Sequence, residues 1–110
     1  MNAYTELLEE LRDDEVVESI VFGEWGWGGF LEPEDNKILP ENQGVLLTLD
    51  QAKPLMQDWS FHGGYGSPEC YATYIWTNKR VMWVTQYDGS TTLSSMPRNP
   101  EPGMPYMSGG

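Results

Sequence analysis

The segment CYATYIW (70–76), TNKR (77–80), VMWVTQY (81–87), DG (88–89) and STTLSSM (90–96) alternates β-forming runs with short polar breaks. Asp-Gly between two such runs is a strong hairpin signal, and Asn78-Lys79 fits a second two-residue turn. We therefore predict a three-stranded antiparallel meander at about residues 70–96. The expected pairs are Tyr74 with Trp83, Ile75 with Met82, Trp76 with Val81, Trp83 with Ser94, Val84 with Leu93, Thr85 with Thr92, and Tyr87 with Ser90.

Alternation of side chains along these strands divides the predicted sheet into two faces. The first face is mainly apolar and is expected to form the core: Ile75, Met82, Val84 and Leu93, with Tyr71, Thr73 and Gln86 towards its end. The second, here called the aromatic face, combines rings with hydroxyl groups: Tyr74, Trp76, Trp83, Thr85, Tyr87, Thr92 and Ser94. Such a surface can stack a planar group, or it can be a second core layer.

The N-terminal part predicts further elements. Tyr4, Leu7, Leu8 and Leu11 have the spacing of an amphipathic helix capped by Asn2, with Glu6 off the apolar stripe. Residues 15–22 have the pattern of a partly central strand. Residues 45–49 predict a short strand, followed by a short helix that Thr48 and Gln51 begin with a capping box. Together these elements predict an α+β fold: an antiparallel sheet of four or five strands with the N-terminal helix packed on one face.

The predicted boundaries follow composition. Residues 1–96 are expected to form a single α+β domain, whereas residues 97–110 are rich in proline and glycine and predict an extended tail. The glycine-rich region 23–44 predicts a long loop.

Charge and composition exclude several classes of protein. The net charge is −11, and residues 1–58 hold fourteen acids against three basic residues, which places the excess in the first half. No basic stripe is present for duplex DNA, and no apolar run is long enough for a membrane span. A single Cys and a single His allow neither an internal disulfide nor a closed zinc site. We expect no cofactor, no secretory signal and a cytoplasmic location.

Candidate reactive groups are few. Cys70 and His62 suggest a nucleophile and a base, but a lone cysteine at the start of a strand is usually a buried, inert thiol. The acidic run Glu32, Glu34 and Asp35 matches no calcium loop and is expected to be solvated. No catalytic residue is therefore predicted, and the protein is expected not to be an enzyme. Arg80 and Arg98 are the best ligands for an anion, with a surface arginine at a turn as the alternative for each.

Two glycine-rich segments carry large rings, GEWGWGGF (23–30) and SFHGGYGSP (60–68). Glycines allow the backbone to bring Trp25, Trp27 and Tyr65 close to another surface. We predict that Trp25 or Trp27 lies over the aromatic face near Trp83 and leaves a cleft there. If both tryptophans instead point into the core, these rings serve packing.

Two stretches have a distinctive amino-acid sequence: EVVESIVFGEWGWGGF (15–30) and SFHGGYGSPECYATYIWTNKRVMWVTQYDGSTTLSSMPRNP (60–100). They resemble a family of small proteins encoded by bacteriophages and prophages. The resemblance implies a small accessory protein that acts in the cytoplasm of the host bacterium, in the manner of anti-defence proteins. It implies no activity and no site residues.

Two functions follow as hypotheses. The first is a binding protein that sequesters a nucleotide-like signalling ligand on the aromatic face; its predicted ligand-binding residues are Trp25, Trp27, Tyr65, Tyr74, Trp76, Arg80, Trp83, Thr85, Tyr87, Thr92 and Arg98. The second is an acidic inhibitor of a host nuclease or CRISPR-type effector, which mimics nucleic-acid charge. Its predicted partner-binding residues are Glu9, Glu10, Asp13 and Asp14. A homo-oligomer is also compatible with the sequence.

Overall fold

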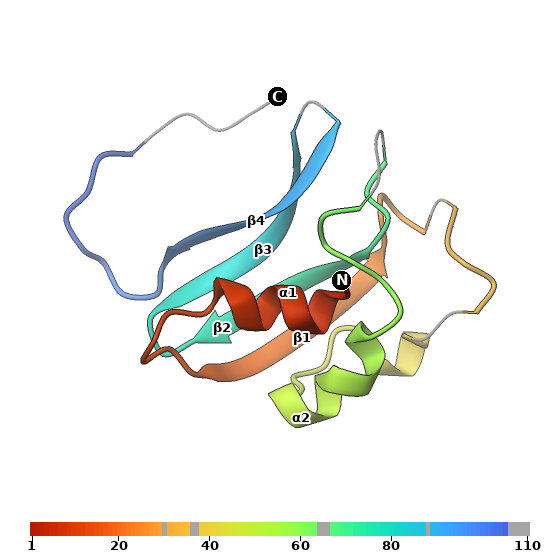
Figure 1. Ribbon diagram of the computed structural model, residues 1–110, viewed down its shortest axis with the longest axis horizontal. Helices are drawn as coiled ribbons and strands as arrows, with labels where there is room; N and C mark the ends of the chain where they lie inside the picture. Colours follow the sequence, from red (N-terminus) through yellow and green to blue (C-terminus); the bar gives the residue numbers. More distant parts are fainter. Residues whose placement is uncertain (30, 36–37, 64–66, 88, 106–110) are drawn as a thin grey trace.

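The computed structural model describes residues 1–29, 31–35, 38–63, 67–87 and 89–105 (Figure 1). Its centre is a four-stranded antiparallel sheet of order β1-β2-β3-β4, with β1 (Val17–Trp25), β2 (Tyr71–Thr77), β3 (Arg80–Tyr87) and β4 (Ser90–Pro97). The helices are α1 (Ala3–Glu10), α2 (Leu49–Ala52) and the 3-10 turns η1 (Pro40–Asn42) and η2 (Lys53–Met56). Figure 1 shows α1 and α2 on the same side of the sheet. The predicted α+β fold is confirmed.

The meander forms with the predicted register. Every pair expected between β2 and β3, and between β3 and β4, is present. Alternation of apolar side chains favours this register, because a shift by one residue would turn every core side chain of a strand to the opposite face. Thr77 supports the first turn, since its Oγ1 accepts hydrogen bonds from Lys79 N at 3.1 Å and from Arg80 N at 3.0 Å.

Helix α1 begins at the predicted cap. Asn2 Oδ1 accepts from Thr5 N at 2.9 Å, and Asn2 N donates to Thr5 Oγ1 at 3.3 Å, so the two residues form a capping box. Leu7 is fully buried, whereas Leu8 remains 41% exposed. Glu6 was expected off the apolar stripe of the helix, and this prediction is wrong. Its carboxylate is buried and accepts hydrogen bonds from Ser60 Oγ and Phe61 N, which ties α1 to the segment after Trp59.

Strand β1 lies at the edge of the sheet, although it was predicted to be partly central. Its free side is partly satisfied by an isolated antiparallel bridge between Ile20 and Leu47 and a parallel one between Phe22 and Gln43. The strand expected at residues 45–49 is therefore wrong, and only the bridge at Leu47 remains of it. The following helix is confirmed: Thr48 caps α2 by a capping box with Gln51.

The core lies between the sheet and the two helices. It is built from apolar residues of α1, β1, α2, η2, β2 and β3 and of the segments that connect them: Ala3, Leu7, Ile20, Phe22, Trp25, Ile38, Ala52, Met56, Trp59, Phe61, Cys70, Tyr71, Ile75 and Met82. Trp59 is its aromatic centre, with edge-to-face contacts to Phe22, Phe61 and Tyr71 at centroid distances of 5.9, 5.4 and 5.4 Å.

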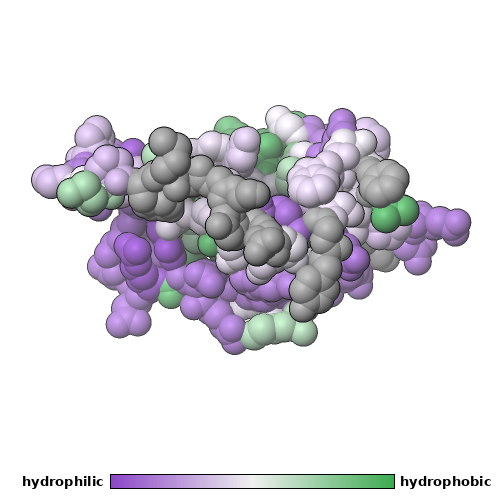
Figure 2. Space-filling model, turned by 90° about the horizontal axis from the view of Figure 1, so that it is seen from above, coloured by the Kyte–Doolittle hydropathy of each residue, from purple (hydrophilic) through white to green (hydrophobic). Residues whose placement is uncertain are grey.

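The surface reflects the charge of the chain. Hydrophilic residues cover most of the face seen in Figure 2, and hydrophobic residues appear there as small separate patches. After Pro97, the described residues up to 105 form neither helix nor strand. Within the described parts of the chain, no helix has the length and apolar character needed to cross a bilayer.

Candidate functional site

The aromatic face forms as predicted on the side of the sheet opposite to the helices. Tyr74 is 56% exposed, Trp76 and Trp83 are partly exposed, and Thr92 is exposed. The rings of Tyr74 and Trp76 meet edge to face, with centroids 6.1 Å apart and planes at 85°. The described helices lie on the other side, so none of them covers these rings.

Two hydroxyl groups of this face, those of Thr85 and Ser94, contact each other. Thr85 Oγ1 lies 2.8 Å from Ser94 Oγ and 3.4 Å from the carbonyl oxygen of Thr92. Each hydroxyl also keeps lone pairs or a rotatable proton that can meet a ligand. The face therefore offers ring surfaces with polar groups beside them.

Two hollows flank Ala72, a small residue in the middle of this side of the sheet. One has a volume of about 170 Å³ and is lined by Trp27, Pro68, Ala72 and Thr85, among others. The other has a volume of about 220 Å³ and is mainly apolar, with Val21, Gly23, Gly44, Ala72 and Tyr74 in its wall. A Cβ on Gly23 would lie 3.3 Å from that of Ala72. The absence of a side chain at Gly23 therefore leaves space for the hollow between these two residues.

Trp27 is the loop ring that approaches this surface. It is 62% exposed and lines the hollow at Ala72 and Thr85; Trp83 is not part of that wall. The loop reaches this position through Gly28 and Gly29, whose φ angles of 74° and 86° are favourable only for glycine. A cleft between this loop and the sheet is therefore present, at a different place from the one predicted.

Trp25 does not lie on the aromatic face, which corrects the prediction for this residue. Phe22 pairs with Thr73 and Trp25 with Tyr71, so three steps along β1 correspond to two along β2. This β-bulge turns Trp25 to the same side as Phe22. Trp25 is 6% exposed and packs edge to face on Tyr71, with a centroid distance of 5.0 Å.

Arg80 is also not available to a ligand on the aromatic face. Its Nε donates to Glu15 Oε2 at 2.8 Å and its Nη2 to Glu15 Oε1 at 3.0 Å, while Nη2 also reaches the carbonyl oxygen of Glu10. Burial raises the pKa of Glu15, but hydrogen bonds from Arg80, Thr77 and the backbone of Arg12 outweigh it and lower this pKa to about 2. The sequence missed this buried pair, because its members lie 65 positions apart.

The remaining predicted ligand residues have different positions. Arg98 forms an ion pair with Glu18, and its Nη1 donates to the carbonyl oxygen of Thr77 at 3.0 Å. Tyr65 and the side chain of Tyr87 lie outside the described residues. The structure therefore brings together Tyr74, Trp76, Trp83, Thr85 and Thr92, with Trp27 at their border.

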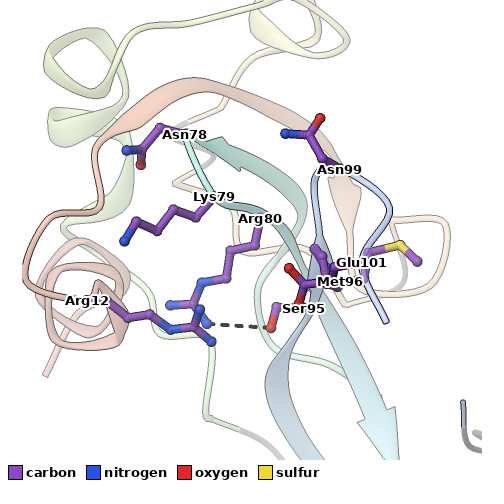
Figure 3. A pocket seen from close by; sticks show the side chains of 9 residues that line it. Arg12, Asn78, Lys79, Arg80, Ser95, Met96, Asn99 and Glu101 are labelled. Carbon is purple, nitrogen blue, oxygen red and sulfur yellow. Dashed lines mark hydrogen bonds between the residues drawn. The ribbon is translucent and has the colours of Figure 1, made fainter. Parts of the chain in front are cut away.

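A polar pocket of about 320 Å³ lies beyond the C-terminal end of α1 (Figure 3). Arg12 and Arg80 extend into the pocket from opposite sides, with Ser95 Oγ 3.5 Å from Arg80 Nη1. Lys79 also lines it, but its ammonium group lies 2.5 Å from Asp14, and Glu101 adds a carboxylate to the wall. Ser95 pairs with the core residue Met82, so the pocket opens on the side opposite to the aromatic face.

The acidic residues of the alternative hypothesis are exposed. Glu9 and Glu10 lie in the last turn of α1, and Asp13 and Asp14 follow it. A hydrogen bond from Lys79 is the main cause of the lowered pKa of Asp14. The other three carboxylates have no cation partner among the described ion pairs.

The candidate reactive residues Cys70 and His62 have different surroundings. Cys70 is buried, and this burial, together with the charge of Glu6, raises the pKa of its thiol to about 12. His62 Nε2 lies 3.1 Å from Glu6 Oε2 instead. Over the residues that the structure describes, no three His, Cys, Asp or Glu side chains are grouped so that they could hold a metal ion.

Comparison with families of known proteins, with curated proteins and with solved structures found no match. The resemblance to small phage proteins therefore stays a prediction from the sequence. The functional argument depends on the site itself.

Proposed function

We propose that the protein is a non-enzymatic binding protein that captures a planar, nucleotide-like ligand on the aromatic face. The observation that carries this proposal is the open cluster of Tyr74, Trp76 and Trp83 beside the hydroxyl groups of Thr85 and Ser94. Aromatic side chains stack on bases of any sequence, and neighbouring hydroxyls satisfy the polar edges of a base.

The ligand is recognised mainly through its ring. Stacking on one aromatic side chain contributes about 1–3 kcal/mol per base, so two rings support a Kd between about 30 mM and about 40 μM. The cations Arg80 and Arg98 are each paired with a carboxylate and do not add a phosphate contact on this face. Because the chain has a net charge of −11, screening by salt should leave the affinity for an anionic nucleotide unchanged or raise it.

In a phage setting, as the sequence resemblance implies, such capture would remove a signalling nucleotide from the host cytoplasm. This anti-defence role, the cytoplasmic location and the absence of catalysis belong to the same proposal. Sequestration requires only that the protein binds the ligand without turning it over.

Thermal-shift screening against nucleosides and linear and cyclic nucleotides tests the proposal. Stabilisation by at least one compound is expected, and Tyr74→Ser should abolish it. Leu46→Ser is the matched control, because Leu46 is exposed and lines neither hollow of this face. A panel without any stabilising compound, or equal stabilisation of both variants, would contradict capture on the aromatic face.

A second candidate function is the acidic inhibitor. It is favoured by the exposed carboxylates of Glu9 and Glu10, in the last turn of α1, and of Asp13, three residues after it. Charge reversal at these positions should abolish binding to a nuclease or other nucleic-acid-binding effector while nucleotide capture is kept. Retained binding of that partner after charge reversal would exclude the mimic.

A further inference from the structure

A further cavity lies on the side of the sheet opposite to the aromatic face, where the loop after β1 meets the segment after η2. It has a volume of about 320 Å³ and is lined by Trp25, Pro33, Asp35, Asp58, Trp59 and Tyr71. This volume is at the lower end of the range for small-molecule sites, so the cavity suits a compact ligand. The aromatic face is not part of its wall, which makes it independent of the proposed nucleotide site.

Three aromatic rings form a fixed part of this wall. Trp25 meets Tyr71 at a centroid distance of 5.0 Å and 79°, and Trp59 meets Tyr71 at 5.4 Å and 65°. Trp59 is further held by the hydrogen bond from its Nε1 to the carbonyl oxygen of Leu55 at 2.7 Å. Rings held in this way are arranged before a ligand arrives, which lowers the entropy cost of binding.

Three carboxylates of the described residues lie near these rings. Asp35 and Asp58 line the cavity, and Glu32 accepts the hydrogen bond of the Tyr71 hydroxyl at 3.2 Å. These acids belong to residues 1–58, the half of the chain that carries the excess negative charge. The cavity thus combines ring surfaces with negative charge, and this combination favours a cation over an anion or a neutral group.

We propose that the cavity of Trp25, Trp59 and Tyr71 binds an alkylated ammonium group. The exposed parts of Trp25 and Trp59, which are 6% and 8% of their surfaces, would contact its methyl groups by cation–π interaction, and Asp35 would supply the counter-charge at the rim. A quaternary ammonium fits better than a primary amine, because it needs no hydrogen-bond acceptor and loses less hydration on entry. The bulge after Phe22 has a functional consequence here, since it directs Trp25 into this wall.

Calorimetric titration of the full chain with choline tests this site, and 3,3-dimethyl-1-butanol serves as the uncharged isostere of choline. Choline is expected to bind at least about tenfold more tightly than the isostere, because cation–π contacts that are partly shielded from water contribute this much. Its affinity should fall as salt is added, which is the reverse of the behaviour expected for an anionic nucleotide.

The variant Asp35→Asn should weaken choline binding by about threefold or more, since one counter-charge is lost. Glu34→Gln is the matched control, because Glu34 is an exposed neighbour that does not line the cavity. Tighter binding of N-acetyl-trimethyl-lysine amide than of choline would indicate a methylated side chain as the natural source of the ammonium. Equal affinity for choline and its isostere, or no binding of either cation, would overturn the proposal.

Discussion

Replacing Glu15 by Gln should remove a contribution to stability that depends on pH between about pH 4.5 and pH 2. Glu15 Oε2 accepts hydrogen bonds from Arg80 Nε at 2.8 Å and Thr77 Oγ1 at 2.6 Å, and Oε1 accepts from Arg80 Nη2 and Arg12 N. These bonds favour the ionised carboxylate and lower its pKa from 4.5 to about 2, against the effect of burial.

The size of the effect follows from this difference. Each unit of pKa corresponds to about 1.4 kcal/mol, so the folded state gains about 3 kcal/mol from the ionised Glu15. Because the pKa is lowered on folding, this contribution is fully present above pH 4.5, where the unfolded carboxyl is also ionised. It is lost as the pH falls from about 4.5 to about 2, and more than half of it is lost at pH 3.

Urea unfolding followed by tryptophan fluorescence between pH 7 and pH 3 measures this effect. Glu15→Gln should lower the free energy of unfolding by about 3 kcal/mol at pH 7, because it also leaves Arg80 buried without its partner. The difference between the variant and the natural protein should shrink towards pH 3. Glu9→Gln, at an exposed position, should change little at any pH. A difference for Glu15→Gln that stays the same from pH 7 to pH 3 would refute the reasoning, because the loss would then come from packing.

Three further predictions concern single substitutions. Chemical unfolding measures the stability of each variant, and the Trp27 variant also requires a measurement of nucleotide binding. Trp27→Ala should lower the free energy of unfolding by less than about 1 kcal/mol, because the ring is 62% exposed, but should weaken nucleotide binding by about 1–3 kcal/mol; a large destabilisation with unchanged binding would make Trp27 a core residue. Trp59→Ala should cost about 3–5 kcal/mol, since three aromatic neighbours lose their central ring, and a loss below 1 kcal/mol would contradict its place in the core. Gly28→Ala should cost about 1–2 kcal/mol because φ is 74°, and an unchanged stability would show that this loop adopts another backbone conformation.

The parts of the fold that local sequence signals determine could be predicted. Asp88-Gly89 and Asn78-Lys79 predicted the register of three strands, and alternation then placed Tyr74, Trp76 and Trp83 on one face. The caps at Asn2 and Thr48 are also local, since each residue binds a partner three positions away. In all these cases the deciding contacts lie within one turn or one hairpin.

The parts that failed depend on contacts between distant segments. One extra residue in β1 turns Trp25 from the aromatic face into the core. Gly23 lies in this bulge, but a glycine at the start of a glycine-rich segment fits the predicted loop equally well. The positions of Glu6 and Arg80 have the same origin. Their partners, Ser60 and Glu15, are separated from them by 54 and 65 positions. Such pairs can be recognised only when the three-dimensional arrangement of these segments is known.

Nuclear magnetic resonance of the indole N–H groups tests the central claim most directly, because the chain has five tryptophans that report on different surfaces. A nucleotide that stabilises the protein should shift the signals of Trp76 and Trp83 on the aromatic face and leave that of Trp59 in the core unchanged. Shifts at Trp25 and Trp59 without any change at Trp76 and Trp83 would contradict capture of a planar ligand on the aromatic face.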